Sequence, residues 1–242
     1  MKTKFFKFIA CFVLLLTFLP NVVSAAPITL PTISELGGGF STLNGSQFTS
    51  DSKYVVTGTS NGTIAVWKTS NGKLEKEIKG ANTEGILNLA LSPDDRYVAS
   101  KLYRGDVIVW DLQNKKAAYT VDLPYSTGGG GSSLYNKDGT IIYVRHFDAR
   151  SIYMLDAANG AIIDQFSYSD NPTSMAYNPQ TNQLAIGFMR GAITIIDGTN
   201  GDYISSISQS VPSAGAIVTS LAYSPTGDEL VATRMEDRKS VV

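Results

Sequence analysis

One pattern repeats along most of this chain, with a period near 43 residues, and it limits the possible folds more than any other feature. Four apolar segments of one kind end 43, 45 and 41 residues apart: Ile64-Ala-Val-Trp67, Val107-Ile-Val-Trp110, Ile152-Tyr-Met-Leu155 and Ile193-Thr-Ile-Ile196. A turn recurs in step with them: Ser92-Pro93-Asp94, Asn136-Lys137-Asp138, Asn178-Pro179-Gln180 and Ser224-Pro225-Thr226. Two columns with the same period indicate a tandem structural repeat.

Each unit contains four short apolar runs of strand length separated by turn residues, and helical periodicity is absent. Between the third and fourth runs stand Asn71-Gly72, Asn159-Gly160 and Asn200-Gly201, a dipeptide that suits two-residue hairpin turns, whereas the second unit has Asn114-Lys115. The first run is apolar on both faces, as expected for the crowded inner edge of a sheet between two neighbours. Each unit is therefore predicted to be a four-stranded antiparallel sheet.

Repeats of about 40 to 45 residues with four strands each are typical of β-propellers. Over about residues 40 to 242 the chain resembles the WD40 (WD-repeat) family. Trp110-Asp111 is the full signature dipeptide, Leu155-Asp156 and Ile196-Asp197 keep the aspartate, and Trp67-Lys68 keeps the tryptophan. The family's Gly-His pair is absent, since His146 is the one histidine. The resemblance implies an all-β propeller of a divergent, exported bacterial type.

The propeller domain is predicted to span residues 26–242. Its blades are expected at about 39–80, 81–123, 124–168 and 169–208, with a partial fifth at 209–242. The favoured interpretation is a fragment of a larger propeller, because Lys239-Ser-Val-Val242 aligns with a third strand and has no polar tail. The alternative is a five-bladed ring in which Ile28 to Ile33 supplies the missing outer strand.

The first 25 residues have the pattern of a signal peptide. Lys2, Lys4 and Lys7 precede an apolar run too short to span a bilayer, and Val23-Ser24-Ala25 suits the peptidase. We therefore expect a secreted, extracellular protein, either free or associated with the cell wall, without stable membrane insertion after cleavage. Subtracting its three lysines from 20 basic residues leaves 17 against 21 acidic ones, and this net charge of −4 disfavours nucleic acid as a partner.

The sequence offers little for catalysis. The one cysteine, Cys11, lies in the predicted signal peptide, so the mature chain would lack thiolates and disulfides. The acidic stretch Asp197 to Asp202 coincides with a hairpin turn, and Gly128 to Gly131 leads into a strand rather than a phosphate-binding helix. The prediction is no enzyme, with no catalytic residue, no metal and no cofactor.

Six of the seven arginines fall in or beside connections between second and third strands, which a propeller places on one side. With neighbouring aromatic residues they form the candidate binding set: Tyr103, Arg104, Arg145, His146, Phe147, Arg150, Phe188, Arg190 and Arg234, with Met189 and Arg238 beside them. Arginine and aromatic residues are typical of protein-binding hot spots. The competing interpretation is that these arginines are ordinary loop residues paired with nearby acids such as Asp106 and Asp148.

The predicted function is a secreted or cell-surface propeller without catalysis that binds a protein or an anionic polymer of the cell envelope. The alternative is the propeller domain of a secreted hydrolase, lactonase or peptidase. Such an enzyme would need charged groups at the channel, where the first strands instead place one polar, uncharged column: Asn88, Ser132, Ser174 and Ser220. The fold alone does not decide between the two functions.

Overall fold

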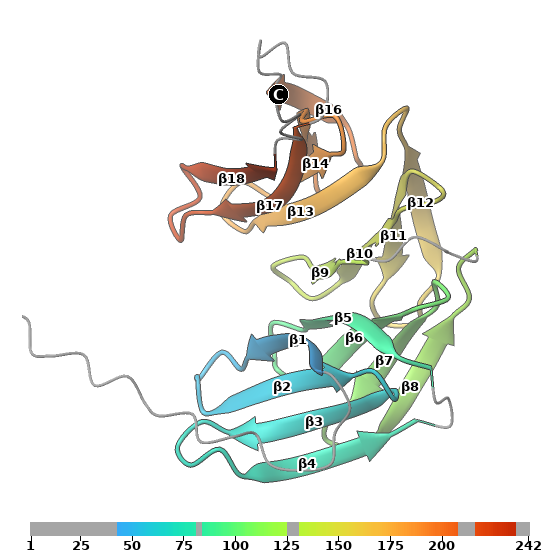
Figure 1. The fold of residues 1–242 in the computed structure, drawn as a ribbon, viewed down its shortest axis with the longest axis vertical. Coiled ribbons are helices and arrows are strands. Elements are labelled where there is room, and N and C mark those ends of the chain that lie inside the picture. The colour runs from blue at the N-terminus through green and yellow to red at the C-terminus, as the bar shows by residue number, and fades with distance from the viewer. Residues whose placement is uncertain (1–42, 81–83, 125–130, 208–215, 236–242) are drawn as a thin grey trace, which may run out of the picture. The chain divides into compact units, whose positions relative to one another are not determined.

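The computed structural model describes residues 43–80, 84–124, 131–207 and 216–235, and these ranges contain strands and turns but no helix (Figure 1). Within them, accordingly, there is no helix that could cross a membrane. The predicted signal peptide, the segment Ile28 to Ile33 and the third strand expected at Lys239 to Val242 lie outside the described residues.

Eighteen strands form five antiparallel sheets in which the spatial order of the strands follows the chain. The first sheet contains β1 (Leu43–Phe48), β2 (Tyr54–Thr59), β3 (Thr63–Lys68) and β4 (Leu74–Lys79). The second contains β5 (Ile86–Leu91), β6 (Tyr97–Leu102), β7 (Val107–Asp111) and β8 (Lys116–Val121). The third contains β9 (Ser133–Tyr135), β10 (Ile141–His146), β11 (Ser151–Asp156) and β12 (Ile162–Ser167).

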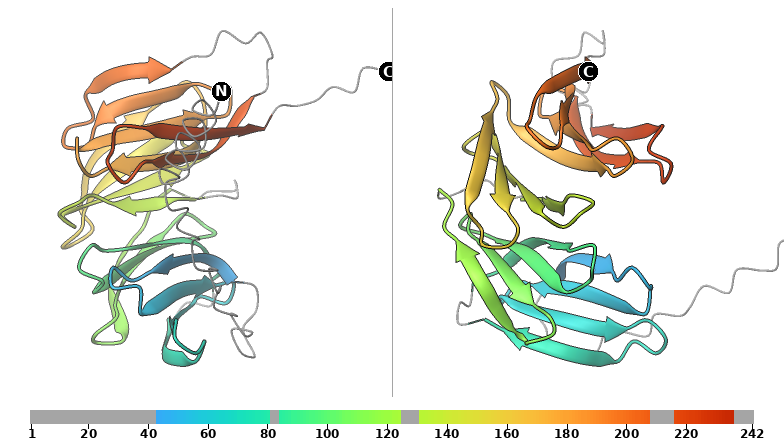
Figure 2. Two further views of the ribbon diagram at one scale, coloured as in Figure 1. Left: turned by 90° about the vertical axis from the view of Figure 1, so that its left-hand side faces the viewer. Right: turned by 180° about the vertical axis from the view of Figure 1, so that it is seen from behind.

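The fourth sheet contains β13 (Pro172–Asn178), β14 (Gln183–Phe188), β15 (Ile193–Asp197) and β16 (Tyr203–Ile207), and the fifth only β17 (Ile217–Tyr223) and β18 (Leu230–Met235). Four complete blades and a partial fifth confirm the predicted fold class. Among the residues that the structure describes, the sheets do not close into a ring, as expected for a partial propeller (Figure 2).

The hairpins between third and fourth strands have the predicted glycines but are longer than two residues. Gly72 adopts a φ of 67° and donates its N–H to the carbonyl of Lys68, 2.9 Å away, which closes a wider turn. Gly160 and Gly201 have φ values of 78° and 74°. In the second sheet Lys115 holds the same left-handed conformation, with φ 54°, although it has a Cβ.

The core lies between successive sheets, because each sheet has two apolar faces. Trp110 and Val98 of the second sheet pack with Val56 and Ile64 of the first, whereas Ala99 of the second packs toward the third. Equivalent clusters join the third sheet to the fourth and the fourth to the fifth. Each blade is thus stabilised by its neighbours, since a lone sheet would expose both faces.

The two tryptophans are held within their own sheets. The indole Nε1 of Trp110 donates to Ser100 Oγ at 2.8 Å, and that of Trp67 donates to Thr57 Oγ1 at 2.9 Å. A histidine network is therefore not required to satisfy either buried indole.

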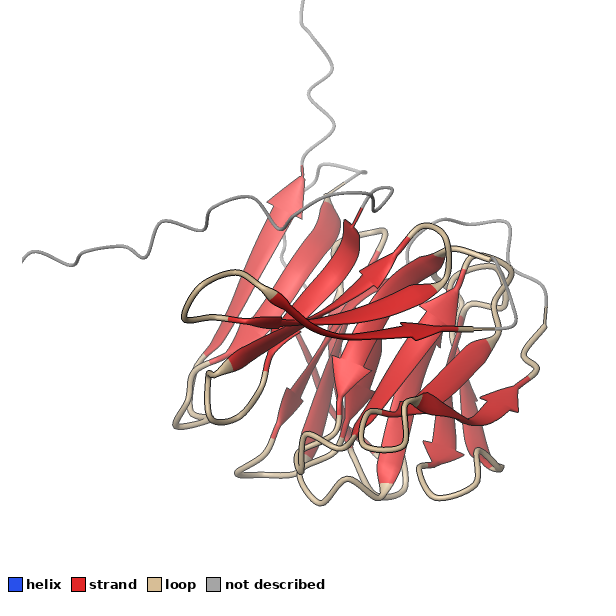
Figure 3. Cartoon of the chain, turned by 90° about the horizontal axis from the view of Figure 1, so that it is seen from below, coloured by secondary structure: helices blue, strands red, loops and turns tan. Residues whose placement is uncertain are grey.

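The first strands of neighbouring sheets run in the same direction. Asn178 Nδ2 donates to the carbonyl of Gly227 at 2.6 Å, and near the start of the same strand Thr173 Oγ1 donates to Val218 O at 2.6 Å. In the first two sheets Gln47 Oε1 accepts from Leu91 N at 2.9 Å. The connections between second and third strands therefore share one side, and the turns after the first strands share the other. Figure 3 shows loops at both ends of the strands.

Candidate functional site

Three connections between second and third strands carry the predicted binding residues that remain accessible. Tyr103 is 49% exposed, Arg104 is exposed beside it, and both follow β6. The connection after β14 exposes Met189 and Arg190, and the one after β10 exposes Arg150 next to a half-buried Phe147. We call these side chains the arginine loop surface: Tyr103, Arg104, Phe147, Arg150, Met189 and Arg190.

The loops at both ends of this surface are fixed by main-chain hydrogen bonds to the segment that precedes the first strand of their own sheet. Tyr103 N donates to Gly85 O at 3.1 Å, and Met189 N donates to Asn171 O at 2.9 Å. The next residue in each loop is the arginine. Its backbone N–H donates to an acidic side chain: Arg104 to Glu84, and Arg190 to Asp170 Oδ2 at 2.9 Å.

These contacts hold the arginine backbones rather than their guanidinium groups. In the described ranges the ion pairs involve Asp51, Glu75, Glu77 and Asp111, and none of them includes Arg104, Arg150 or Arg190. Arg150 Nη1 is 3.4 Å from the carbonyl oxygen of Ser169, a long hydrogen bond. The described contacts therefore give no support to pairing of these three arginines with neighbouring acids.

Arg145 belongs to the interior, which corrects its expected place on the exposed loops. It is 5% exposed on β10, where Nη1 donates to Pro172 O at 2.9 Å and Nε donates to Ser132 Oγ at 3.3 Å. Burial lowers the pKa of Arg145 to about 10. This guanidinium connects the third sheet to the fourth.

His146 and Phe188 are also interior. His146 is 1% exposed, and its Nδ1 accepts the N–H of Ala149 at 3.1 Å, which leaves Nε2 to donate to Pro124 O at 2.6 Å. Phe188 packs edge-on against Tyr168, with ring centroids 5.0 Å apart. Both side chains pack beneath the surface, next to the loops that follow β10 and β14, and cannot contact a partner in this conformation.

The ninth predicted residue, Arg234, lies half-buried on β18, and its Nε has no hydrogen-bond partner in the described part of the chain. Arg238 lies outside the described residues. A binding role for any of the nine stays a prediction.

Sequence reasoning missed Lys101, which occupies in β6 the repeat position that Arg145 occupies in β10. Its side chain is 1% exposed, and its stem fills the space beside Gly131, where an added Cβ would lie 2.0 Å from Lys101 Cδ. Burial, and secondarily the nearby Arg145, lowers the pKa of Lys101 to about 8. Its signal was a basic residue in a column that holds glycine at Gly58 and Gly187.

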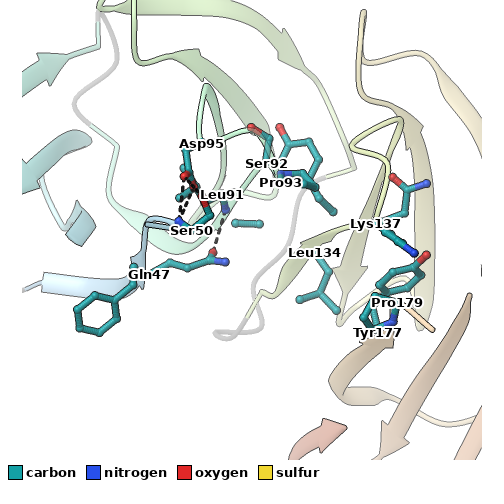
Figure 4. A pocket seen from close by; sticks show the side chains of 14 residues that line it. Gln47, Ser50, Leu91, Ser92, Pro93, Asp95, Leu134, Lys137, Tyr177 and Pro179 are labelled. Carbon is teal, nitrogen blue, oxygen red and sulfur yellow. Dashed lines mark hydrogen bonds between the residues drawn. The ribbon is translucent and has the colours of Figure 1, made fainter. Parts of the chain in front are cut away.

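On the opposite side, the ends of the first strands surround a cavity of about 460 Å³ (Figure 4). Leu91, Leu134 and Tyr177 contribute apolar surface to it. Its polar groups bind one another: Ser50 N and Oγ both donate to Asp95 Oδ2, at 2.9 and 2.5 Å. Among the residues that the structure describes, no three His, Cys, Asp or Glu side chains are grouped to hold a metal ion.

Comparisons with known proteins agree with this architecture. The model of the WD40 family, described as "WD domain, G-beta repeat", matches residues 33–68. The β-propeller domain of Cps50 (Swd1) from Myceliophteria thermophila superposes with a TM-score of 0.67 and 20% identity, covering 82% of this chain and 64% of that domain.

Curated relatives match at lower coverage. Transcription factor unc-37 of Caenorhabditis elegans is 22% identical over 57% of this chain, and transcription initiation factor TFIID subunit 5 of the same organism is 24% identical over 46%. Autophagy-related protein 16 of Arabidopsis thaliana is 23% identical over 63%. The chain spans only 22%, 17% and 29% of their lengths. Together with the sheets, these matches confirm the predicted β-propeller fold and show similarity to WD-repeat proteins, with residues 33–68 matching the WD40 model itself. An exported bacterial origin stays a prediction.

Proposed function

We propose that this protein is a secreted or cell-surface scaffold without catalysis, and that its arginine loop surface binds an acidic protein surface. One observation carries the proposal: exposed guanidinium groups on adjacent loops take part in no described ion pair and stand beside exposed Tyr103 and Met189. Planar guanidinium groups bind carboxylates in a bidentate manner, and neighbouring aromatic or thioether surface supplies apolar contact area.

The fixed loop backbones support a recognition role. Because the main chain at Arg104 and Arg190 is already bonded to the preceding segment, less conformational entropy is lost when their side chains bind. The curated relatives are named a transcription factor, an initiation factor subunit and an autophagy-related protein, and none of these names denotes an enzyme. Secretion rests on the predicted signal peptide, and a mature N-terminus at Ala26 in the culture fluid would be its direct test.

The binding proposal is tested with a fluorescein-labelled peptide of alternating glutamate and glycine, and in parallel with labelled polyphosphate as a model envelope polymer. Replacing both Arg104 and Arg190 by alanine should lower the affinity for the peptide about ten-fold, because two charge-assisted contacts are lost. The matched control removes two lysines, Lys73 and Lys137, from turns on the opposite side, and should change affinity less than about two-fold.

Equal affinity of the Arg104→Ala/Arg190→Ala variant and the unaltered protein would overturn the proposal, provided that circular dichroism finds both folded. Much tighter binding of polyphosphate than of the peptide would also overturn it, in favour of an anionic polymer.

A further inference from the structure

The second and third sheets do not pack fully on the side opposite the arginine loop surface, where a groove of about 680 Å³ lies between them. Its walls combine three tyrosines from three different strands, Tyr97 of β6, Tyr119 of β8 and Tyr135 of β9. No lysine, arginine or histidine lines the groove, but three aspartates do: Asp94, Asp138 and Asp156. Aromatic walls with carboxylates suit a cationic guest.

The tyrosines and aspartates are close enough to influence one another. Burial raises the pKa of Tyr135, and Tyr119, Asp94 and Tyr97 raise it further. Burial likewise raises the pKa of Tyr119 to about 12, with a further contribution from Asp156. These groups therefore form one cluster across the boundary between the two sheets.

Two aspartates are held in place by their own turns. Asp94 Oδ1 accepts from Ser92 Oγ at 2.5 Å and from Arg96 N at 3.1 Å, and Asp156 Oδ1 accepts from Ala158 N at 2.7 Å. No described hydrogen bond uses the exposed carboxylate of Asp138. The groove thus holds negative charge in fixed positions before any partner arrives.

One further observation favours a cation in particular. The protein places one of its own cations on a tyrosine of this cluster, because the Arg96 guanidinium carbon lies 4.9 Å from the centre of the Tyr97 ring. The hydroxyl of Tyr135 is itself buried and has no hydrogen-bond partner among the described residues, so a guest in the groove meets the ring of Tyr135 and not its hydroxyl.

We propose that this groove binds a lysine or arginine side chain from an exposed segment of a protein partner. The cationic group lies against the faces of Tyr119 and Tyr135, and the carboxylates of Asp138 and Asp156 balance its charge. The site is independent of the arginine loop surface, which prefers the opposite charge and lies on the other side of the sheets.

The probe is an acetylated, amidated pentapeptide, Ser-Gly-Arg-Gly-Ser, titrated into the full chain while amide resonances are followed by NMR. A second peptide carries citrulline in place of arginine, with the same shape and no charge. We expect the arginine peptide to shift the amides of Gly139, Thr140 and Ala157, and to bind about five-fold more tightly than the citrulline peptide.

Two variants separate the contributions of charge and ring. The double variant Asp138→Asn/Asp156→Asn should lower the affinity for the arginine peptide about five-fold. The control Asp164→Asn, on exposed β12, should leave that affinity unchanged. Tyr119→Leu should weaken binding about three-fold, and Tyr119→Phe, which keeps the ring but loses the bond to Ala157 O, should retain most of it.

Equal binding of both peptides, or shifts confined to the loops around Arg104 and Arg190, would overturn the inference. The Arg104→Ala/Arg190→Ala variant should bind the arginine peptide normally. Comparing this variant with the unaltered protein therefore tests the groove proposal separately from the proposal for the arginine loop surface.

Discussion

The boundary between the second and third sheets differs from the boundary between the third and fourth, although the same three positions of the repeat form both. The first boundary has Ala99, Lys101 and Tyr135, and the second has Tyr143, Arg145 and Tyr177. The order of the strands is the same at both, so equivalent side chains can be compared.

The boundary between the third and fourth sheets is closed. Tyr143 is fully buried, stacks on Tyr177 with ring centroids 5.9 Å apart, and donates its hydroxyl to Gly198 O. A Cβ at Gly198 would lie 2.8 Å from that hydroxyl, so glycine is needed there. Tyr177 in turn donates to Asn182 Oδ1 at 2.6 Å. The hydroxyls of Tyr143 and Tyr177 thus both have a partner.

The boundary between the second and third sheets is open on the same side. At the repeat position of Tyr143 the second sheet has Ala99, which is fully buried, and the Tyr135 hydroxyl has no partner among the described residues. The groove of about 680 Å³ lies there. Equivalent positions of the repeat thus carry different side chains at the two boundaries, and the two boundaries differ in packing.

The largest predicted effect comes from opening the closed boundary. Tyr143→Ala should lower the free energy of unfolding by about 4 kcal/mol, because it removes a fully buried ring and its hydrogen bond across the sheets. Urea denaturation followed by circular dichroism measures this loss. Tyr203→Ala is the control, since Tyr203 is 66% exposed and its removal should cost little. Similar losses for both variants would contradict the difference in packing.

The next effect concerns Lys101. Its pKa falls from 10.5 to about 8 on folding, so below pH 8 the folded state carries a desolvated ammonium at a cost of about 3 kcal/mol. Between pH 8 and 10.5 the folded state releases its proton first, and this penalty disappears. Lys101→Met should therefore stabilise the protein at pH 7 by up to about 3 kcal/mol, and the gain should shrink above pH 8.

Thermal melts of both proteins across pH 6 to 10.5 give the difference curve. Lys116→Met, at an exposed position of β8, should give a flat difference near zero. A gain for Lys101→Met that does not change with pH would mean that packing, and not charge, explains it.

A smaller effect is expected from exchanging the basic residue at the closed boundary. Arg145→Lys should lower the free energy of unfolding by about 2 kcal/mol, because an ammonium cannot reproduce the separate contacts of Nε with Ser132 and Nη1 with Pro172. It should also give this boundary the pH dependence described for Lys101, with stability rising above pH 8. Urea denaturation at pH 7 and 9.5 tests both points, and equal stability at pH 7 would contradict the first.

The repeat made the sheets predictable, because its period fixes strand number and its glycines mark the turns that need a positive φ. Lys115 shows the limit of that argument, since it adopts the conformation without being glycine. The prediction of two-residue hairpin turns was wrong, because an Asn-Gly pair also occurs in the wider turn seen at Gly72.

The candidate site was predicted only in part. Arg104 and Arg190 lie two residues beyond the end of a strand and are exposed, but Arg145 lies one residue inside the end of β10, where neighbouring sheets cover both faces of the strand. A strand end read from sequence is rarely precise to one or two residues, and a side chain inside that end is buried on either face, as Arg145 and His146 are. The tyrosine groove required knowing which columns face each other across sheets, which a period alone does not give.

The finest test of the comparison uses one oxygen atom at each boundary. Tyr177→Phe should lower the free energy of unfolding by about 1 kcal/mol, because Asn182 loses its donor. Tyr135→Phe removes a buried hydroxyl that has no partner among the described residues, so it should be neutral or stabilising by up to about 1 kcal/mol. Both substitutions remove a tyrosine hydroxyl at the same repeat position. The difference between their changes in unfolding free energy therefore reports the hydrogen bond and not the removal of the hydroxyl as such. Urea denaturation of both variants in one buffer measures it, and equal losses would mean that Tyr135 has a partner after all.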